Sequence, residues 1–431
     1  MNQTLLSRVP NPKRKGSSLS KTNPFRYYAG FSSDFAEECL SILKDDKPNL
    51  RVLDPWNGSG TTTSACAKLG ISAAGSDLNP VANILSVARL AQSNDVDTVI
   101  SKISALSLEN FCLESQDEED PLHQWFSDSA VGLIRAVEKD LLLDPAEVRE
   151  RFKISGTLSV PELQLAAVVY VTLFGAIRSV AKLPQTTNPT WMRASVADSK
   201  KVDIDSSEFL EMIRSAADNL KAVAPRKSLP RKSHIEIVKA NCQNLPFEDT
   251  SFAVVFGSPP YCTRLDYAVA TRMELAILGC DPGSEFKELR RDLIGTTAVG
   301  AFSEGPPELG VKARALVDRI QSHPSKSSGS YYYKTYSSYF VAMTRSIEEL
   351  SKKLKNDGYG FFVVQNSYYK EILVNLADLI TEMAEMSNLH LESAKDFEVE
   401  RTLRQIHASR SRYGRRELPT ETVMVFKNNL S

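Results

Sequence analysis

Apolar residues in positions 23–95 recur first at helical spacing and then in short continuous runs, which predicts helices alternating with strands. Ser33 is a suitable helix cap, and the apolar residues that follow it recur every three or four positions. The next elements are expected at Leu50–Leu53 (strand), Thr61–Leu69 (helix), Ile71–Ser76 (strand) and Pro80–Leu90 (helix). Strands that alternate with helices indicate a parallel sheet.

The same alternation returns after residue 235. Strands are expected at Ile235–Lys239, Phe252–Phe256 and Tyr359–Val364, and near Leu389–Ser393 and Thr422–Phe426. Helices are expected at Ser337–Lys355 and Ile372–Met386. Together with the first two strands this makes about seven. The predicted fold class is therefore α/β, built on a mostly parallel sheet.

Residues 96–235 interrupt the alternation with three successive helical patterns, at Phe126–Leu142, Val160–Val180 and Ser206–Val223. We interpret this stretch as a helical insertion. It separates a first half of the sheet domain (21–95) from a second half (236–431), and residues 1–20 are predicted to form a flexible basic tail. The apolar run inside the insertion covers about 15 residues, too few to span a bilayer, so a buried core helix and no membrane partner are expected.

The composition mainly excludes classes of protein and kinds of site. The 431 residues are 42% hydrophobic and 24% charged, as in ordinary globular proteins, and the net charge is −1. No global positive field therefore indicates a nucleic-acid partner, and any such partner needs a local basic surface. The six cysteines form no CxxC pair, which argues against a zinc site or a disulfide framework. The N-terminus has no apolar signal core, so we expect a cytoplasmic protein with reduced thiols.

A glycine-containing loop, Gly58-Ser-Gly60, follows the first predicted strand and begins a helix. Glycines allow close backbone approach, and free amides at a helix start attract anionic or polar ligands. The loop matches neither the GxxxxGK[ST] nor the GxGxxG phosphate motif. Asp77 ends the second strand, where its carboxylate can accept hydrogen bonds from the hydroxyls of a ribose. The alternative is a plain strand-to-helix turn in which Asp77 only caps the next helix.

Three segments carry a resemblance to a known family. Asp54-Pro-Trp-Asn-Gly-Ser-Gly-Thr-Thr62 resembles the DPFxGSGTT motif of amino-methylating DNA methyltransferases, with Trp56 where Phe is commoner. Gly75-Ser-Asp-Leu-Asn-Pro80 is similar to their acidic second motif, and Asn23–Ser32 more loosely resembles an aromatic segment that covers the methionine end of the cofactor.

The resemblance implies a Rossmann-like methyltransferase sheet and S-adenosyl-L-methionine as cofactor. The residues that it implies for cofactor binding are Tyr28, Phe31, Asp54, Pro55, Trp56, Asn57, Gly58, Gly60, Thr61, Thr62, Asp77, Leu78, Asn79 and Asn241. Asn241 stands where many such enzymes have Asp, and it is expected near the cofactor adenine.

The tetrapeptide Ser258-Pro259-Pro260-Tyr261 follows the Phe252–Phe256 strand, where open α/β sheets bind ligands. An exocyclic amine of a base is a poor nucleophile, because its lone pair is delocalised into the ring. Hydrogen bonds from its two N–H groups to Ser258 Oγ and the Pro259 carbonyl would favour a pyramidal nitrogen whose lone pair faces the methyl donor. Tyr261 offers a ring on which a base flipped out of a duplex can stack. We therefore predict all four residues to be catalytic.

The SPPY form resembles N4-cytosine enzymes, whereas N6-adenine enzymes more often carry DPPY or NPPY. Cys262 lacks the Pro-Cys context of a C5-cytosine nucleophile. The order of the two motifs departs from many SPPY enzymes, which are permuted. An N6-adenine DNA methyltransferase, an RNA amine methyltransferase and a catalytically inactive DNA-binding scaffold remain open alternatives.

Duplex DNA is the expected partner, together with a cognate restriction endonuclease. One candidate surface is the segment 264–336, expected to be either a target-recognition region or a lid. The other is the arginine-rich stretch 401–416, since clustered guanidinium groups suit phosphate contacts. The residues predicted to contact DNA are Arg264, Arg404, Arg410, Arg412 and Arg415.

Overall fold

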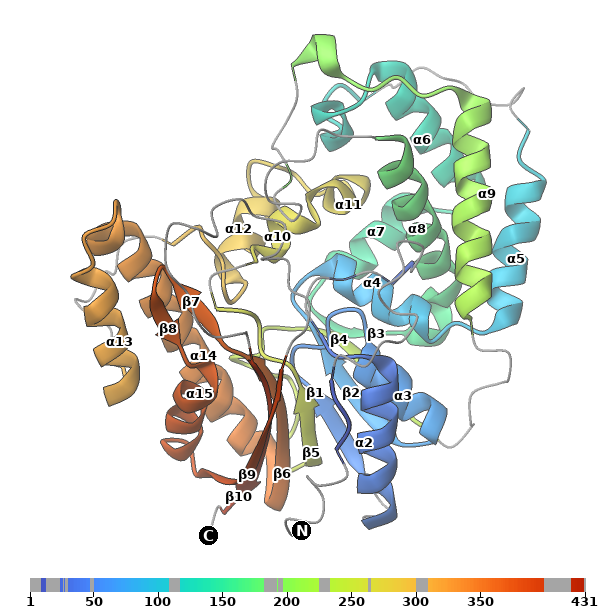
Figure 1. Ribbon diagram of the computed structural model, residues 1–431. Coiled ribbons are helices and arrows are strands. Elements are labelled where there is room, and N and C mark those ends of the chain that lie inside the picture. The colour runs from blue at the N-terminus through green and yellow to red at the C-terminus, as the bar shows by residue number, and fades with distance from the viewer. Residues whose placement is uncertain are drawn as a thin grey trace.

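The computed structural model describes residues 9–12, 24–25, 27, 30–46, 50–107, 117–181, 192, 197–224, 233–262, 265–299, 309–398 and 420–429. Its centre is an eight-stranded sheet in the order β3-β4-β2-β1-β5-β6-β10-β9 (Figure 1). The strands are β1 (Arg51–Asp54), β2 (Ser72–Ser76), β3 (Gly156–Leu158), β4 (Ile235–Lys239), β5 (Phe252–Gly257), β6 (Leu354–Gln365), β9 (Leu389–Glu398) and β10 (Thr420–Asn428). The predicted α/β class with a mostly parallel sheet is confirmed.

Five adjacent strands of the sheet are parallel to one another: β4, β2, β1, β5 and β6. β3 runs antiparallel to its neighbour β4, and β10 runs antiparallel to its neighbour β6. The register places Val52 of β1 beside Val254 of β5, and Leu53 beside Val255. Because the strands are parallel, the loops that follow β1, β2 and β5 leave the sheet at one edge. That edge carries the site described below.

Alternate residues of the strands build a core on each face of the sheet. On one face, Val52 and Val254 belong to a cluster with α2 (Ser33–Asp46) and α3 (Thr61–Leu69). On the other face, Leu53 and Val255 belong to a cluster with α13 (Val311–Gln321), α14 (Tyr333–Lys353) and α15 (Leu376–Glu385). The two helical layers are visible on either side of the sheet in Figure 1. The side-chain period of two in a strand accounts for this division.

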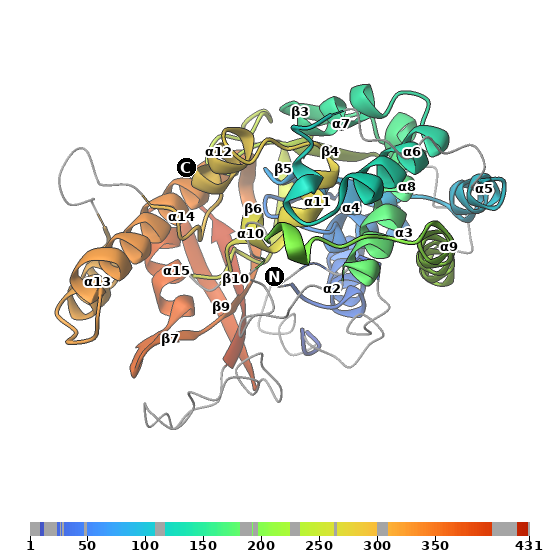
Figure 2. The same ribbon diagram turned by 90° about the horizontal axis from the view of Figure 1, so that it is seen from above.

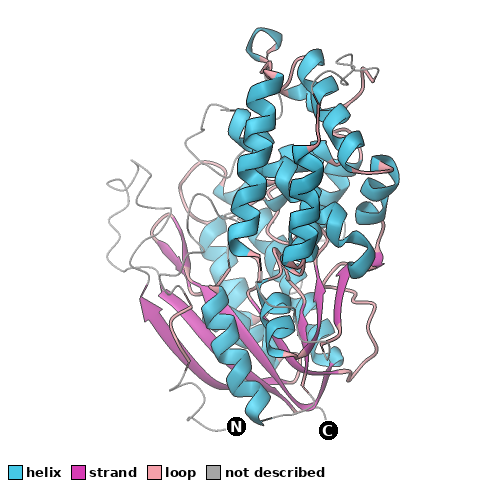
Figure 3. Cartoon of the chain, turned by 90° about the vertical axis from the view of Figure 1, so that its right-hand side faces the viewer, coloured by secondary structure: helices cyan, strands magenta, loops and turns pink. Residues whose placement is uncertain are grey.

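A third core joins the helices of the inserted stretch, which gather beyond one end of the sheet (Figure 3). They are α5 (Ser93–Ser104), α6 (Asp128–Leu141), α7 (Pro145–Lys153), α8 (Val160–Val180) and α9 (Ser206–Val223). α8 is long and apolar enough to cross a membrane by length and composition, but 72% of its most apolar window is buried inside the protein. It packs as the central helix of this bundle, in contact with α4 (Pro80–Arg89) of the sheet domain.

Some elements differ from those predicted. Ile372–Val374 is not the start of a helix but the strand β8, which forms a hairpin with β7 (Ser367–Tyr369). The helix α15 starts only after Asn375, whose side chain caps it by accepting from the amide of Asp378. β3 was not predicted, because three residues are too few to show a periodicity.

The segment expected to be a target-recognition region or a lid is largely helical where the structure describes it. It contains α10 (Tyr267–Ala270), α11 (Arg272–Ile277), α12 (Glu285–Asp292), α13 and the π-helix η5 (Ser328–Tyr332). Seen from above, α10 and α12 lie between α14 and the inserted helices (Figure 2).

Candidate active site

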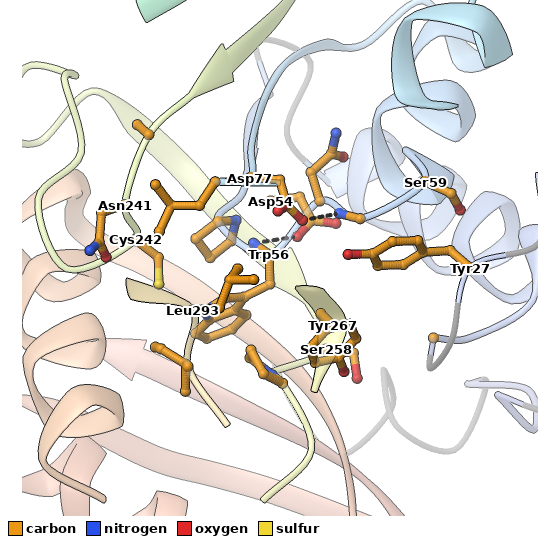
Figure 4. Close-up of a pocket in the computed structure, with 18 of the residues that line it drawn as sticks. Tyr27, Asp54, Trp56, Ser59, Asp77, Asn241, Cys242, Ser258, Tyr267 and Leu293 are labelled. Atoms are coloured by element: carbon orange, nitrogen blue, oxygen red, sulfur yellow. Dashed lines mark hydrogen bonds between the residues drawn. The ribbon is translucent and has the colours of Figure 1, made fainter. Parts of the chain in front are cut away.

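A pocket of about 830 Å³, partly open to solvent, lies at the edge where β1, β2 and β5 end (Figure 4). It brings together the loop after β1 and the loop after β5, which are some 200 positions apart in the sequence. The predicted site residues that line it are Phe31, Asp54, Pro55, Trp56, Asn57, Gly58, Thr61, Asp77, Leu78, Asn241, Ser258 and Pro260.

The remaining predicted residues lie beside the pocket or outside the described part of the chain. Thr62 and Asn79 support lining residues through hydrogen bonds, and Gly60 supports the loop by its backbone shape. Pro259 and Tyr261 adjoin the lining residues Ser258 and Pro260 in the chain. The predicted residues Tyr28, Arg264, Arg404, Arg410, Arg412 and Arg415 fall outside the described residues.

The loop after β1 owes its shape to close packing on α4. Gly60 has a φ of 78°, and a Cβ at this position would lie 2.9 Å from the backbone Cα of Ser86. Asn57 donates from Nδ2 to Ser86 Oγ at 2.8 Å and accepts from Thr63 Oγ1 at 3.1 Å. The glycine-containing loop is therefore held against α4 and α3 by buried polar contacts.

Arg89, at the end of α4, holds the same loop from outside. Its Nε donates to the carbonyl of Ser59 at 2.8 Å, and its guanidinium lies 4.7 Å from the ring centre of Phe25. Burial lowers the pKa of Arg89 to about 10. No sequence pattern indicates this role, since a basic residue in the last turn of a helix is common for other reasons.

Two acidic side chains face the pocket. Asp77 accepts hydrogen bonds from the backbone amides of Gly58 at 3.0 Å and Asn79 at 2.8 Å, yet burial raises its pKa to about 6. Asp54 accepts from Thr62 Oγ1 at 2.5 Å and from the amide of Trp56 at 3.1 Å. Its pKa is raised to about 7, mainly by burial and slightly by the nearby Asp77. Two buried carboxylates close together favour a ligand that carries positive charge.

Aromatic rings form one wall of the pocket. Tyr27, which is not among the predicted residues, lines the pocket, and its ring stacks on Tyr267 at 5.8 Å between centroids. Its hydroxyl group hydrogen-bonds to the side chain of Asn79. Phe31 also lines the pocket and packs edge-on against Phe256 at 5.3 Å. The aromatic segment before α2 thus covers the pocket from the side of the first half of the sheet domain.

The strand β5 ends at a glycine, because a side chain there would collide with the end of the neighbouring strand β1. A Cβ on Gly257 would lie 2.7 Å from Asp54 Oδ1. Ser258 Oγ donates to the carbonyl of Val363 in β6 at 2.8 Å, and Tyr339 of α14 donates to the carbonyl of Pro260 at 2.9 Å. The proline-containing turn is therefore fixed from two neighbouring elements.

The inserted bundle holds the helices that follow this turn. Arg178 of α8 forms an ion pair with the buried Glu274 of α11 and donates to the carbonyl of Ala270 at 3.0 Å. Arg135 of α6 donates to the carbonyl of Ile277 at 2.7 Å. From the loop after β2, the side chain of Asn79 donates to Thr271 Oγ1 at 3.0 Å. Three separate elements thus position α10 and α11.

Neither metal nor disulfide chemistry is indicated in the part of the chain that the structure describes. No group of three or more His, Cys, Asp or Glu side chains there could hold a metal ion. The described cysteines are buried and form no disulfide bond with one another: Cys39, Cys66, Cys242, Cys262 and Cys280.

Comparison with known proteins finds Type II DNA methyltransferases. The chain is 25% identical to M.BsoBI of Geobacillus stearothermophilus over 296 residues, which cover 64% of this chain but only 56% of that protein. It is 22% identical to M.AvaI of a Nostoc species over 395 residues (85% of this chain, 79% of the relative). It is 20% identical to M.MvaI of Kocuria varians over 390 residues (84% and 81%). These matches confirm the resemblance to DNA methyltransferases.

No protein-family model matches the chain. Among solved structures, an rRNA methyltransferase, AviRa of Streptomyces viridochromogenes, aligns over 98% of this chain and 96% of its own at 11% identity. Its TM-score of 0.29 is too low to support an argument from that structure.

Proposed function

We propose that this relative of Type II DNA methyltransferases transfers a methyl group from S-adenosyl-L-methionine to the exocyclic amine of a base flipped out of duplex DNA, with cytosine N4 as the target. The observation that carries the proposal is the shared pocket. Asp54 and Asp77 lie on one side of it and Ser258 lies on the other. Methyl transfer requires the methyl donor and the acceptor amine to be held close together, and here both loops line the same pocket.

The residues of the pocket fit the proposed cofactor. It is lined by aromatic side chains together with a few polar and acidic groups, as small-molecule sites are. Asp54 and Asp77 suit a molecule with a sulfonium and an ammonium group, because burial has made their ionised forms unfavourable without a nearby cation. Asp77 would accept from the ribose hydroxyls, Phe31 would cover the methionine end, and Asn241 would lie near the adenine. When bound, S-adenosyl-L-methionine supplies an electrophilic methyl carbon.

The side chain of Ser258 is suited to accept a hydrogen bond from the amine rather than to donate one. Its hydroxyl hydrogen is directed to the carbonyl of Val363, so the lone pairs of Oγ remain for the base. Tyr339 fixes the peptide group of Pro260, which in turn orients the carbonyl of Pro259 as the second acceptor. These two acceptors would hold the amine nitrogen pyramidal, and Tyr261 would stack on the flipped base. No covalent intermediate with the protein is needed.

The choice of cytosine N4 rests on the Ser-Pro-Pro-Tyr form of the tetrapeptide. As the methylating half of a restriction-modification pair, the protein would protect its recognition site against a cognate endonuclease. Protection is checked by expressing the chain with a plasmid and testing the plasmid against a panel of endonucleases.

The main test identifies the methylated nucleoside. The purified protein is incubated with labelled S-adenosyl-L-methionine and either duplex DNA or tRNA, and the digested product is analysed by mass spectrometry. N4-methylcytosine in DNA is expected. N6-methyladenine would keep the reaction but overturn the target base, and methyl transfer to tRNA alone would overturn the substrate. Ser258→Ala serves as the control, because it should bind cofactor and yield almost no product.

A further inference from the structure

Two turns on the α13 side of the protein are tied together by hydrogen bonds. One turn, residues 323–328, follows α13, and the other, residues 369–372, joins β7 to β8. The hydroxyl of Tyr369 lies 3.0 Å from Ser325 Oγ and 2.5 Å from Ser328 Oγ. His323 Nε2 lies 2.7 Å from Glu371 Oε1. We call this pair of turns the braced tip.

The braced tip is connected to the candidate active site through β6 and α14. Val363, which accepts the hydrogen bond of Ser258, lies in β6, and β7 begins only four positions after it. Tyr336 of α14, the helix that also holds the Pro260 carbonyl, packs edge-on against Tyr369 at 5.9 Å. Figures 1 and 2 both place α13 on the opposite side of the sheet from the inserted helices. The pocket thus lies between the braced tip and the insertion.

Charge is distributed unequally between these two sides. Residues 309–345 and 366–375, which contain the braced tip, have seven Lys and Arg residues against two Asp and Glu residues. Residues 93–224, which contain the inserted helices, have 13 basic against 21 acidic residues. The near-neutral chain therefore carries a local basic arm on one side of its pocket and an acidic bundle on the other. A polyanion is attracted to the first and repelled by the second.

The backbone of the braced tip adds an independent observation. Lys370 has a φ of 55° and Ser327 a φ of 66°, values that glycine or asparagine adopts at lower cost than lysine or serine. A strained residue that persists in a well-braced turn suggests a functional requirement. Lys370 lies between Tyr369 and Glu371, and the exposed Lys326 directly follows Ser325, so the hydrogen bonds hold both lysines on adjoining turns.

We propose that the braced tip binds the phosphate backbone of the duplex DNA whose base enters the pocket, with Lys326 and Lys370 as phosphate contacts. This inference rests on the proposed function, because it assumes a duplex substrate. A two-stranded ribbon can approach the major groove. The hydrogen bonds between the turns hold the backbone at both lysines before DNA arrives, which lowers the entropic cost of binding.

The test uses Lys326→Gln, Lys370→Asn and the double variant of the full chain. The probe is a short fluorescent duplex of mixed sequence, whose anisotropy is followed over a series of salt concentrations. Each substitution should weaken binding roughly tenfold at 0.1 M salt and reduce the slope of log K against log salt by about 0.9. Lys139→Gln is the matched control, because this exposed lysine lies on α6 of the acidic bundle and should change neither value.

Two further measurements separate a contact with DNA from a structural role. Asparagine tolerates a positive φ better than lysine, so Lys370→Asn should keep or raise the melting temperature while it weakens DNA binding. Binding of S-adenosylhomocysteine without DNA should not change in any variant.

The proposal is overturned if the double variant binds the duplex with the affinity and salt slope of the wild type, or if the loss of affinity follows a loss of melting temperature. If wild-type protein methylates DNA while the double variant binds it normally, the inference fails and the proposed function stands. If the wild type binds no duplex at all, both are wrong.

Discussion

The two buried carboxylates make cofactor affinity dependent on pH in a direction that can be calculated. In the protein without ligand, the pKa of Asp54 is about 7 and that of Asp77 about 6. At pH 6, about one-tenth of the Asp54 side chains are therefore ionised, and at pH 8 about nine-tenths. If the cationic cofactor binds the ionised form, its affinity should rise about tenfold over this range from Asp54, and about twofold more from Asp77. Above about pH 8 the affinity should level off.

Calorimetric titration with S-adenosyl-L-methionine between about pH 6 and 8 measures this increase, and buffers of different ionisation enthalpy show whether a proton is released on binding. The thioether S-adenosylhomocysteine is the matched ligand, since it lacks the sulfonium charge and should show a smaller increase. Asp54→Asn should remove most of the pH dependence. A dissociation constant that does not change with pH in the wild type, or an equal pH dependence in Asp54→Asn, would refute the reasoning.

The Asp54 carboxylate should also make folding stability depend on pH. Cofactor affinity should rise with pH, whereas folding stability should fall. The folded pKa of Asp54 is raised from 3.8 to about 7, so its contribution to stability is fully present below about pH 4 and is lost as the pH rises through 7. The melting temperature of the ligand-free protein should therefore fall from about pH 5 to pH 8, and Asp54→Asn should reduce that fall. A wild-type melting temperature that rises over this range would contradict the proposed burial of an unpaired charge.

Four substitutions test the remaining contacts. Ser258→Ala should slow methyl transfer at least about a hundredfold in single-turnover assays and leave cofactor affinity unchanged, because it removes an acceptor aimed at the amine. Asp77→Ala should do the reverse and weaken cofactor binding about tenfold or more in calorimetry, since it removes an ionised acceptor; an unchanged dissociation constant would exclude its ribose role. Tyr339→Phe should lower the transfer rate about fivefold, the value of one hydrogen bond to Pro260, with little change in melting temperature. Gly257→Ala should reduce both affinity and rate, because its methyl group would meet Asp54.

The sheet and the meeting of the two loops could be predicted because both depend on local patterns. Buried parallel strands such as β5 appear as continuous apolar runs, and parallel strands bring the loops at their carboxyl ends to one edge. The sequence alone therefore predicts that the loop after β1 and the loop after β5 lie together. The chemical roles of the individual side chains stay predictions, to be decided by the variants above.

The residues that were missed act through contacts between distant segments. Tyr27 is absent from the predicted set, because the sequence of an irregular segment does not show what each ring packs against, here Tyr267. The residues next to Arg89 and Gly257 in the sequence form no motif that indicates their contacts. Only the folded structure shows which residues the two contact. The residues of β8 are predicted to begin a helix because their apolar side chains suit either element, and the helix in fact starts only after the cap at Asn375.

The arginine contacts from the inserted bundle have a consequence for the ancestry and engineering of such chains. Arg135 and Arg178 reach across to the carbonyls and the carboxylate of α11, so the bundle and that helix form a single mechanical unit although about a hundred positions separate them. A chimera that exchanges the bundle alone would leave Glu274 buried without its counter-charge, at a cost of about 3–5 kcal/mol. We therefore expect natural variants to change Arg178 and Glu274 together, and successful grafts to carry both segments from one parent.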